Sequence, residues 1–384
     1  MTQSCSREGE SRGEGATPAA GEVPRVALLT PPGRGALSVV GVAGPGAVAI
    51  VSKLFSPRGR TPLAERPAGG VAFGTWRSEA SGATEDLVVV RRGDEELEVH
   101  CHGGLAAVES VISALERLGC RRQPWTAWLL AGGARRIGVE AHEALAAAGG
   151  PKAAKILSRQ LAGGLEEAVG RVESLLRASR VADAHAAIDR LVRASRIGLR
   201  LTSPWRVVIA GEANVGKSSL ANALAGHDRC IVSPEAGTTR DLLETRIVID
   251  GWEIDLVDTA GQRDRHALAA VGSVELAGID RAVAACRDAD LVVRVCDGST
   301  RAPRMPAAPG ELPVFTKADL AAAIPQQHAG AVWTSAVTGR GIDDLAARIV
   351  RRLVPEEQDD PTLLAGGVPF TARQVRLIES LRPS

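Results

Sequence analysis

Residues 205–224 constrain this chain more than any other segment, because they join a strand, a glycine-containing loop and a helix in a fixed order. The run Trp205–Ala210 leads into the loop GEANVGKSS, and Leu220–Leu224 continues as a helix. Such glycines let the backbone wrap around phosphate groups, whose charge is bound by loop N–H groups and the helix N-terminus. Lys217 is predicted to reach the β- and γ-phosphates, and the Ser218 hydroxyl to ligate Mg²⁺. The pattern predicts a P-loop nucleotide-binding domain.

Three later motifs indicate that the nucleotide is GTP rather than ATP. The strand Glu253–Val257 ends in DTAG, whose carboxylate can reach Mg²⁺ through water and whose glycine N–H can sense a γ-phosphate. The strand Leu312–Phe315 ends in TKAD, and its carboxylate can accept two N–H bonds from guanine, which adenine cannot offer. The run SAV at 335–337 follows another short strand and offers backbone donors to the base. The residues predicted to contact the nucleotide are Asn214, Val215, Gly216, Lys217, Ser218, Ser219, Ser233, Gly237, Thr238, Thr239, Asp258, Thr259, Ala260, Gly261, Thr316, Lys317, Ala318, Asp319, Ser335, Ala336 and Val337.

The loop GTTRD at residues 237–241 is a candidate switch between the P-loop and the DTAG motif. Thr239 is predicted to complete the Mg²⁺ shell with Ser218 and Asp258 when a γ-phosphate is present, and to leave it after hydrolysis. The alternative interpretation is a threonine-rich surface turn.

Charge, aromatic content and cysteine usage exclude several protein classes. The chain has 46 Lys and Arg against 45 Asp and Glu. The resulting net charge of +1 gives no overall positive electrostatic potential that would attract nucleic acid. Aromatic residues make up 3% with no Tyr, which disfavours stacking platforms for single-stranded nucleic acid. The six cysteines form no CxxC pair, no apolar signal segment opens the chain, and no apolar run reaches the roughly 18 residues that cross a membrane. The sequence predicts a cytoplasmic protein without a membrane span.

The hydrophobic pattern predicts a multidomain α/β protein in five parts. Residues 1–22 hold almost no large apolar side chain and are expected to form a disordered tail. Residues 23–120 predict an N-terminal α+β domain, and residues 121–203 predict a helical domain of two or three helices. Residues 204–354 alternate strands and helices, which predicts a P-loop GTPase domain with a Ras-like, mostly parallel sheet, and residues 355–384 are expected to be a remnant of the helical domain. The β-rich runs of the first domain are Val26–Leu29, Leu37–Val42, Leu87–Val90 and Leu97–His100.

The motifs taken together resemble the MnmE (TrmE) family of tRNA-modification GTPases. The GTPase domain carries GxxNxGKSS, GTTRD, DTAG and SAxTGxG, and the N-terminal part carries TPPGRG at 30–35 and CHGG at 101–104. The resemblance covers roughly residues 23–350. It implies GTP hydrolysis coupled to modification of a wobble uridine in tRNA, a flavoprotein partner, a one-carbon folate, and a homodimer whose GTPase domains associate with K⁺. The K⁺ ligands that it implies are Asn214, Ser233, Glu235 and Thr238, although Asn214 can also be read as loop filler.

The residue that orients the attacking water departs from the family pattern. The glutamate of the family falls on Ala270 when the segment after DTAG is aligned without gaps. Gln262 directly follows Gly261, where Ras-like GTPases place the glutamine that orients the water. We therefore expect Gln262, with Lys217 and Thr239, to be catalytic. The alternative interpretation of Gln262 is an exposed residue in a mobile loop.

Other positions also depart from the family. The folate-binding arginine becomes Gly41, and the folate-binding lysine falls near Gly133. The family continues to a C-terminal cysteine motif that this sequence does not contain, and Thr316 replaces the usual Asn of the guanine motif. These departures keep an alternative function open, a GTP-dependent regulatory or ribosome-assembly switch that has lost the modification role.

Two clusters are given structural interpretations. His100 and His102 lie on one face of a strand and Cys101 on the other, so the three do not form a metal site. A set of arginines before the GTPase domain could touch tRNA phosphates, but a solvated helix face is the preferred interpretation. These arginines are Arg180, Arg190, Arg193, Arg196 and Arg200.

Overall fold

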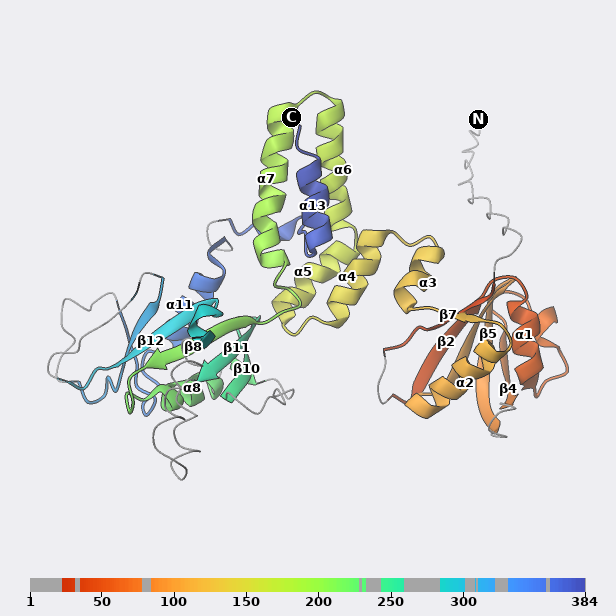
Figure 1. Ribbon diagram of the computed structural model, residues 1–384, viewed down its shortest axis with the longest axis horizontal. Helices are drawn as coiled ribbons and strands as arrows, with labels where there is room; N and C mark the ends of the chain where they lie inside the picture. The colour runs from red at the N-terminus through yellow and green to blue at the C-terminus, as the bar shows by residue number, and fades with distance from the viewer. Residues whose placement is uncertain are drawn as a thin grey trace, which may run out of the picture. The chain divides into compact units, whose positions relative to one another are not determined.

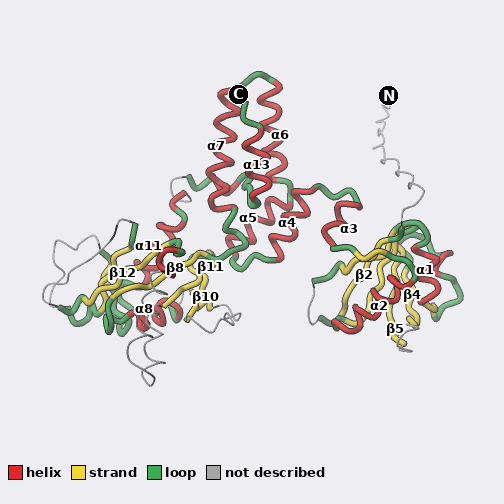
Figure 2. The backbone as a smooth tube through the Cα atoms, in the orientation of Figure 1, coloured by secondary structure: helices red, strands yellow, loops and turns green. Residues whose placement is uncertain are grey.

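The structure is a computed structural model that describes residues 23–31, 35–77, 84–227, 230–232, 243–258, 284–300, 308, 310–321, 331–356 and 360–383 (Figures 1 and 2). Contacts divide the chain into two units, Met1–Ala134 and Arg135–Ser384. The predicted tail at 1–22 lies outside the described residues. The combination of an α+β domain, a helical segment and a P-loop α/β domain confirms the predicted multidomain α/β class.

The first unit is a seven-stranded sheet with the helices α1 and α2 packed on one face and α3 on the other. The strand order is β3-β4-β5-β6-β2-β1-β7, and every pairing is antiparallel except the short β1–β7 pair. Alternation along β6 buries Leu97, Val99 and Cys101, and the apolar stripe of α2, including Val111 and Leu115, belongs to the same core. The elements are β1 (Arg25–Leu28), β2 (Leu37–Ala43), α1 (Ala47–Leu54), β3 (Phe55–Pro57), β4 (Val71–Arg77), β5 (Thr84–Gly93), β6 (Glu96–His102), α2 (Leu105–Arg117), β7 (Arg121–Arg122) and α3 (Trp125–Ala131).

Helix α3 belongs to the first unit, so this unit extends past the expected domain boundary at Cys120. Trp128 is buried against Ala27 and Ala43, on the sheet face that α1 and α2 leave open. The indole covers Gly41 so closely that a Cβ atom there would lie 2.7 Å from Trp128 Cζ2. Gly41 is therefore a position that only glycine can occupy without a shift of the indole.

The helical part of the second unit is assembled from two separate stretches of the chain. The first stretch supplies α4 (Arg136–Ala146), α5 (Pro151–Leu161), α6 (Gly164–Arg177) and α7 (Val181–Gly198). The second stretch supplies a 3₁₀ turn at Leu363–Ala365 and α13 (Ala372–Ser380), which packs against α7. The expected remnant of the helical domain at 355–384 thus contains a helix that returns to the bundle.

Polar contacts fix this returning stretch to the bundle. Arg373 donates two hydrogen bonds to the Glu140 carboxylate on α4, at 2.6 and 2.7 Å, and Gln374 donates a third at 2.7 Å. Burial raises the pKa of Glu140, but the hydrogen bonds from Arg373 and Gln374 outweigh burial and hold its pKa below the usual value. The buried Gln160 amide accepts from the Val368 N–H at 3.1 Å. The returning stretch is therefore held by specific bonds as well as by apolar contact.

The GTPase part of the second unit is a seven-stranded sheet with the order β14-β13-β12-β8-β11-β10-β9. The five strands from β14 to β11 are parallel, whereas β10 and β9 run antiparallel to their neighbours. The elements are β8 (Trp205–Gly211), α8 (Lys217–Ala225), β9 (Cys230–Val232), β10 (Leu243–Ile249), β11 (Trp252–Asp258), β12 (Leu291–Asp297), β13 (Leu312–Thr316), β14 (Val332–Trp333) and α11 (Ile342–Leu353). The sheet is mostly parallel, as the alternation of strands and helices predicts.

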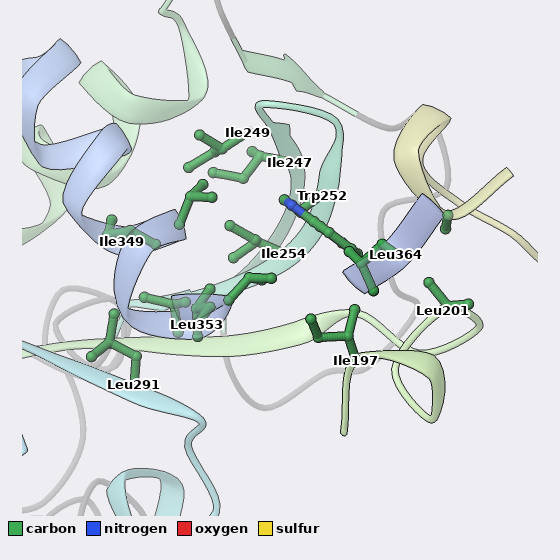
Figure 3. Packing of buried hydrophobic residues seen from close by; sticks show 14 of the residues in the cluster. Ile197, Leu201, Ile247, Ile249, Trp252, Ile254, Leu291, Ile349, Leu353 and Leu364 are labelled. Carbon is green, nitrogen blue, oxygen red and sulfur yellow. The ribbon is translucent and has the colours of Figure 1, made fainter. Parts of the chain in front are cut away.

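A single apolar core joins the helical and GTPase parts (Figure 3). Figure 3 shows Trp252 of the β10–β11 hairpin beside Leu364 of the returning stretch. At the tip of the hairpin, Lys152 Nζ donates to Asp250 Oδ2 at 2.8 Å, and the Lys152 N–H donates to the Gly251 carbonyl at 3.2 Å. The hairpin therefore docks on the N-terminal end of α5.

The arginines along α7 pair with carboxylates of the same chain. Arg190 and Arg196 pair with Asp360 and Glu356, which lie in the segment that leaves α11. Arg200, two residues after the end of α7, pairs with Asp290 just before β12. These pairs compensate much of the positive charge on the helix, in agreement with a structural role for these residues.

Candidate functional site

The P-loop lies at the point where the chain changes direction across the GTPase sheet. After β8 the chain builds β9, β10 and β11 on one side, and later returns to build β12 on the other side of β8. Ligands of open parallel sheets bind at such a point, beyond the carboxyl ends of the strands. Gly211, Asp258 and Asp297 end the strands β8, β11 and β12, and so all three lie at this edge.

The glycines of the P-loop are required by its geometry. A Cβ atom at Gly211 would lie 2.3 Å from the Val295 carbonyl oxygen on β12. Gly216 has φ of 93° and forms the N-cap of α8, and Asn214 also lies in the left-handed region at φ of 62°. The loop therefore turns tightly and directs the N-terminus of α8 to this edge of the sheet, as a phosphate site requires.

Lys217 is buried within the loop, with 6% of its surface exposed. Its Nζ donates to the carbonyl oxygens of Gly211 at 3.0 Å and Glu212 at 2.5 Å. A buried ammonium group needs such acceptors, and phosphate oxygens can take the place of these carbonyls as acceptors. The lysine is thus held inside the loop that is predicted to surround the phosphates.

The TKAD motif is tied to the P-loop by two side chains. The Thr316 hydroxyl lies within hydrogen-bonding distance of the Val215 and Cys296 carbonyls, and its single hydrogen serves one of them at a time. Lys317 Nζ donates to the Asn214 carbonyl at 3.1 Å. Thr316 therefore links the P-loop to the TKAD loop at residues 316–319, which we call the base loop.

Asp297 is a residue of this site that the sequence motifs do not reveal. Its Oδ2 accepts from Lys317 Nζ at 2.6 Å, and its Oδ1 accepts from the Ser299 N–H at 2.9 Å and from Ser299 Oγ at 2.5 Å. Burial raises the pKa of Asp297, but the bonds from Lys317 and Ser299 outweigh it and lower the pKa below the usual value. Its signal in the sequence is a polar residue at the carboxyl end of a buried strand of a parallel sheet.

The SAV run lies beside the TKAD loop. The Ala318 N–H donates to the Thr334 carbonyl at 3.0 Å, and the buried Ser335 donates its N–H to the Arg340 carbonyl at 2.9 Å. Ala336 and Val337 are exposed, and Val337 leaves 86% of its surface open. The structure therefore brings the two predicted base-binding loops together.

Two of the predicted magnesium ligands fit the chemistry of that ion. Ser218 lies in the first turn of α8 with an exposed side chain, and the buried Asp258 ends β11. Hydroxyl and carboxylate oxygens are ligands that Mg²⁺ prefers. Thr239, the third predicted ligand, lies outside the described residues. Also outside them are Ser233, Glu235, Gly237, Thr238, Thr259, Ala260, Gly261 and Gln262.

The histidines of β6 serve structural contacts. His100 Nε2 lies 3.0 Å from Glu98 Oε2, and His102 Nδ1 lies 2.6 Å from Glu85 Oε1, whereas Cys101 is buried. Burial raises the pKa of the Cys101 thiol to about 11, so it stays protonated at neutral pH. In the part of the chain that the structure describes, no cluster of three His, Cys, Asp or Glu side chains could hold a metal ion. Every helix within the same ranges is too short or too polar to cross a membrane.

Comparison with known proteins agrees with this geometry. The family described as "50S ribosome-binding GTPase" matches residues 206–317, and the family described as "GTP-binding protein TrmE N-terminus" matches residues 25–124. Both the GTPase part and the first unit are therefore recognised independently.

Similarity to whole proteins extends along most of the chain. A "tRNA modification GTPase MnmE" from Chlamydia abortus is 30% identical over 361 residues, which cover 83% of this chain and 78% of that protein. Proteins of the same name from Synechococcus sp. and Thermus thermophilus are 32% and 31% identical. The Synechococcus match covers 87% of this chain and 82% of that protein, and the Thermus match covers 92% and 87%. With this similarity spanning both units, the chain belongs to the MnmE family of tRNA modification GTPases.

Proposed function

We propose that this chain couples the hydrolysis of GTP to the modification of a wobble uridine in tRNA. The chain is a GTP hydrolase by its family and its G domain, and it releases GDP and phosphate. The observation that carries the proposal is the match of residues 25–124 to the TrmE N-terminus, in addition to the GTPase match. A regulatory or ribosome-assembly switch is not favoured, because such a role would not explain why the first unit matches the TrmE N-terminus.

Nucleoside analysis of tRNA from a deletion strain of the source organism tests the coupling. We expect the modified wobble uridine to disappear on deletion and to return with the wild-type gene but not with Lys217→Ala, because hydrolysis drives the step. Unchanged wobble uridine in the deletion strain would contradict the proposal, and altered ribosomal subunit ratios in that strain would favour the assembly switch.

The proposed hydrolytic site uses hard oxygen ligands and one positive side chain. Ser218, Asp258 and Thr239 hold Mg²⁺, which neutralises charge on the phosphates, and Lys217 contacts the β- and γ-phosphate oxygens. Gln262 orients the attacking water. This arrangement is supported by the position of Lys217, Ser218 and Asp258, which all lie at the carboxyl edge of the sheet where β8 and β11 end.

Potassium is proposed as a second ion of the site. Asn214 lies in the P-loop, and its side chain is exposed. Its amide oxygen is therefore accessible to an ion that binds beside the phosphates. Ser233, Glu235 and Thr238 complete the proposed ligand set. A cation at this position supplies the positive charge that an arginine finger provides in other GTPases.

Steady-state hydrolysis in KCl and in NaCl tests both the ion and Gln262. We expect hydrolysis to be roughly 10–100-fold faster in KCl, because one added charge stabilises the transition state, and Asn214→Ala to remove this difference. Gln262→Ala should lower kcat by about 100-fold or more and leave GTP affinity unchanged. Equal rates in the two salts would exclude the potassium site, and wild-type turnover in Gln262→Ala would exclude its catalytic role.

The residues of the first unit do not fit a folate bound as the resemblance implies. Gly41 offers no charge for a glutamate tail, and the Trp128 indole covers the space above it. Gly133 also carries no charge. No step through folate is therefore proposed, whereas a homodimer, a flavoprotein partner and a cytoplasmic location are proposed from the family resemblance.

A further inference from the structure

The carboxylate of Asp297 is placed beside the base loop by the register of the sheet. Asp297 on β12 pairs with Thr316 on β13, and Val295 two residues earlier pairs with Gly211 at the start of the P-loop. One strand therefore contacts both nucleotide-binding loops. Gly298 allows β12 and β13 to lie this close where they end, because a Cβ atom at position 298 would lie 2.6 Å from the Thr316 carbonyl oxygen.

Both oxygens of this carboxylate are used, and each has a separate task. Oδ1 accepts two bonds from Ser299, which holds the carboxylate in one orientation. Oδ2 is then directed at Lys317 Nζ, 2.6 Å away. The same Nζ donates to the Asn214 carbonyl at 3.1 Å. Asp297, Lys317 and Asn214 therefore form a chain of contacts from β12 through the base loop to the P-loop.

Lys317 needs such support because its backbone is strained. Its φ of 57° lies in the left-handed region, which residues with a Cβ atom rarely adopt. Strained conformations persist where surrounding contacts over-determine them, and they cluster at ligand sites. The neighbouring bond from the Gly298 N–H to the Thr316 carbonyl, at 2.9 Å, contributes to this support.

We propose that Asp297 is a positioning residue for GTP and GDP, which retains the nucleotide by fixing Lys317 against the P-loop. Asp297 acts through Lys317 and makes no contact with the nucleotide itself. The proposal rests on the GTP-binding role of this site. Without the Asp297 carboxylate, the Lys317 side chain would be flexible and would have to be ordered each time the base binds. This entropy cost would lower the affinity for the nucleotide.

A purely structural role for the ion pair predicts a different outcome. Asp297 and Lys317 leave 23% and 35% of their side chains exposed, and ion pairs of this kind contribute little to folding. A structural role would therefore produce only a small shift of the thermal unfolding midpoint and leave the nucleotide dissociation rate unchanged. A positioning role would change the lifetime of the bound nucleotide.

The test is the dissociation rate of a fluorescent GDP analogue from the full chain, measured in Mg²⁺ without tRNA. We expect Asp297→Asn to release the nucleotide at least about tenfold faster and to raise the KM for GTP, with kcat at saturating GTP within about threefold of wild type. The control is Glu311→Gln, which removes the ion pair with Arg294 on the same strand without touching either loop. This control should leave the dissociation rate unchanged.

A double-mutant cycle with Lys317→Ala shows whether Asp297 acts through Lys317. We expect the double variant to release the nucleotide no faster than Lys317→Ala alone, because the second change removes the group that Asp297 positions. Additive effects, or an unchanged dissociation rate with a lowered unfolding midpoint in Asp297→Asn, would overturn the proposal. Because the assay contains no tRNA, its failure is distinct from any failure of the coupling to tRNA modification.

Discussion

Replacing Asp319 with asparagine is expected to lower the affinity for GTP by roughly 10⁴-fold, the discrimination that a site built around specific hydrogen bonds achieves. The carboxylate is an acceptor only, and guanine offers it two donors, N1–H and the 2-amino group. An amide in its place presents N–H groups toward the 2-amino group of guanine. Competition binding with unlabelled GTP measures this loss.

Xanthosine triphosphate provides the control for this variant. Xanthine carries a carbonyl oxygen where guanine carries the amino group, and the amide N–H of the introduced asparagine can donate to that oxygen. Asp319→Asn should therefore bind and hydrolyse XTP at a rate near that of wild type with GTP. A variant that binds neither nucleotide, or that retains GTP binding, would show that Asp319 does not read the base.

Replacing Lys217 with alanine is expected to lower kcat for GTP hydrolysis by about 10²–10³-fold, because a pre-positioned charge is removed from the phosphate site. Its Nζ is buried and donates to two loop carbonyls, so the side chain does not have to be ordered from solvent when GTP binds. Steady-state phosphate release at saturating GTP measures the effect.

The fold of this variant must be checked separately, since Lys217 also bonds the loop. The thermal unfolding midpoint reports on folding, and the Asn222→Ala variant, on the exposed face of the same helix, serves as a matched control for hydrolysis. Turnover of Lys217→Ala within about threefold of wild type, with an unchanged midpoint, would exclude Lys217 from the phosphate site.

The strand–loop–helix of the P-loop could be predicted because its chemistry is local. Position 211 needs glycine because the Val295 carbonyl lies close to it, and position 216 needs glycine because its φ is positive. Lys217 follows directly in the motif. The base-binding loops are equally local, since TKAD begins at the last residue of β13 and SAV begins two residues after β14. The placement of Gln262 and of the switch residues stays a prediction.

Contacts that depend on tertiary structure could not be predicted in the same way. Asp297 is one acidic residue among 45 Asp and Glu until the register of β12 and β13 places it beside Lys317. Helix α1, which covers Ala47–Leu54, is too short to be stable alone and forms by packing on the sheet. Trp128 follows the expected boundary at Cys120 and joins the first unit only because α3 returns to the open face of the sheet.

The insertion of the GTPase part between α7 and α13 also has a consequence for synthesis of the chain. Helices α4 to α7 leave the ribosome before the GTPase part. The surface that packs against Leu363, Val368 and Ile378 therefore stays uncovered until the complete GTPase part has been translated. At typical rates of translation this interval is on the order of 10–30 s. During it the nascent helices expose apolar surface, so the period before α13 emerges is the one in which a chaperone would act and in which aggregation would compete with folding.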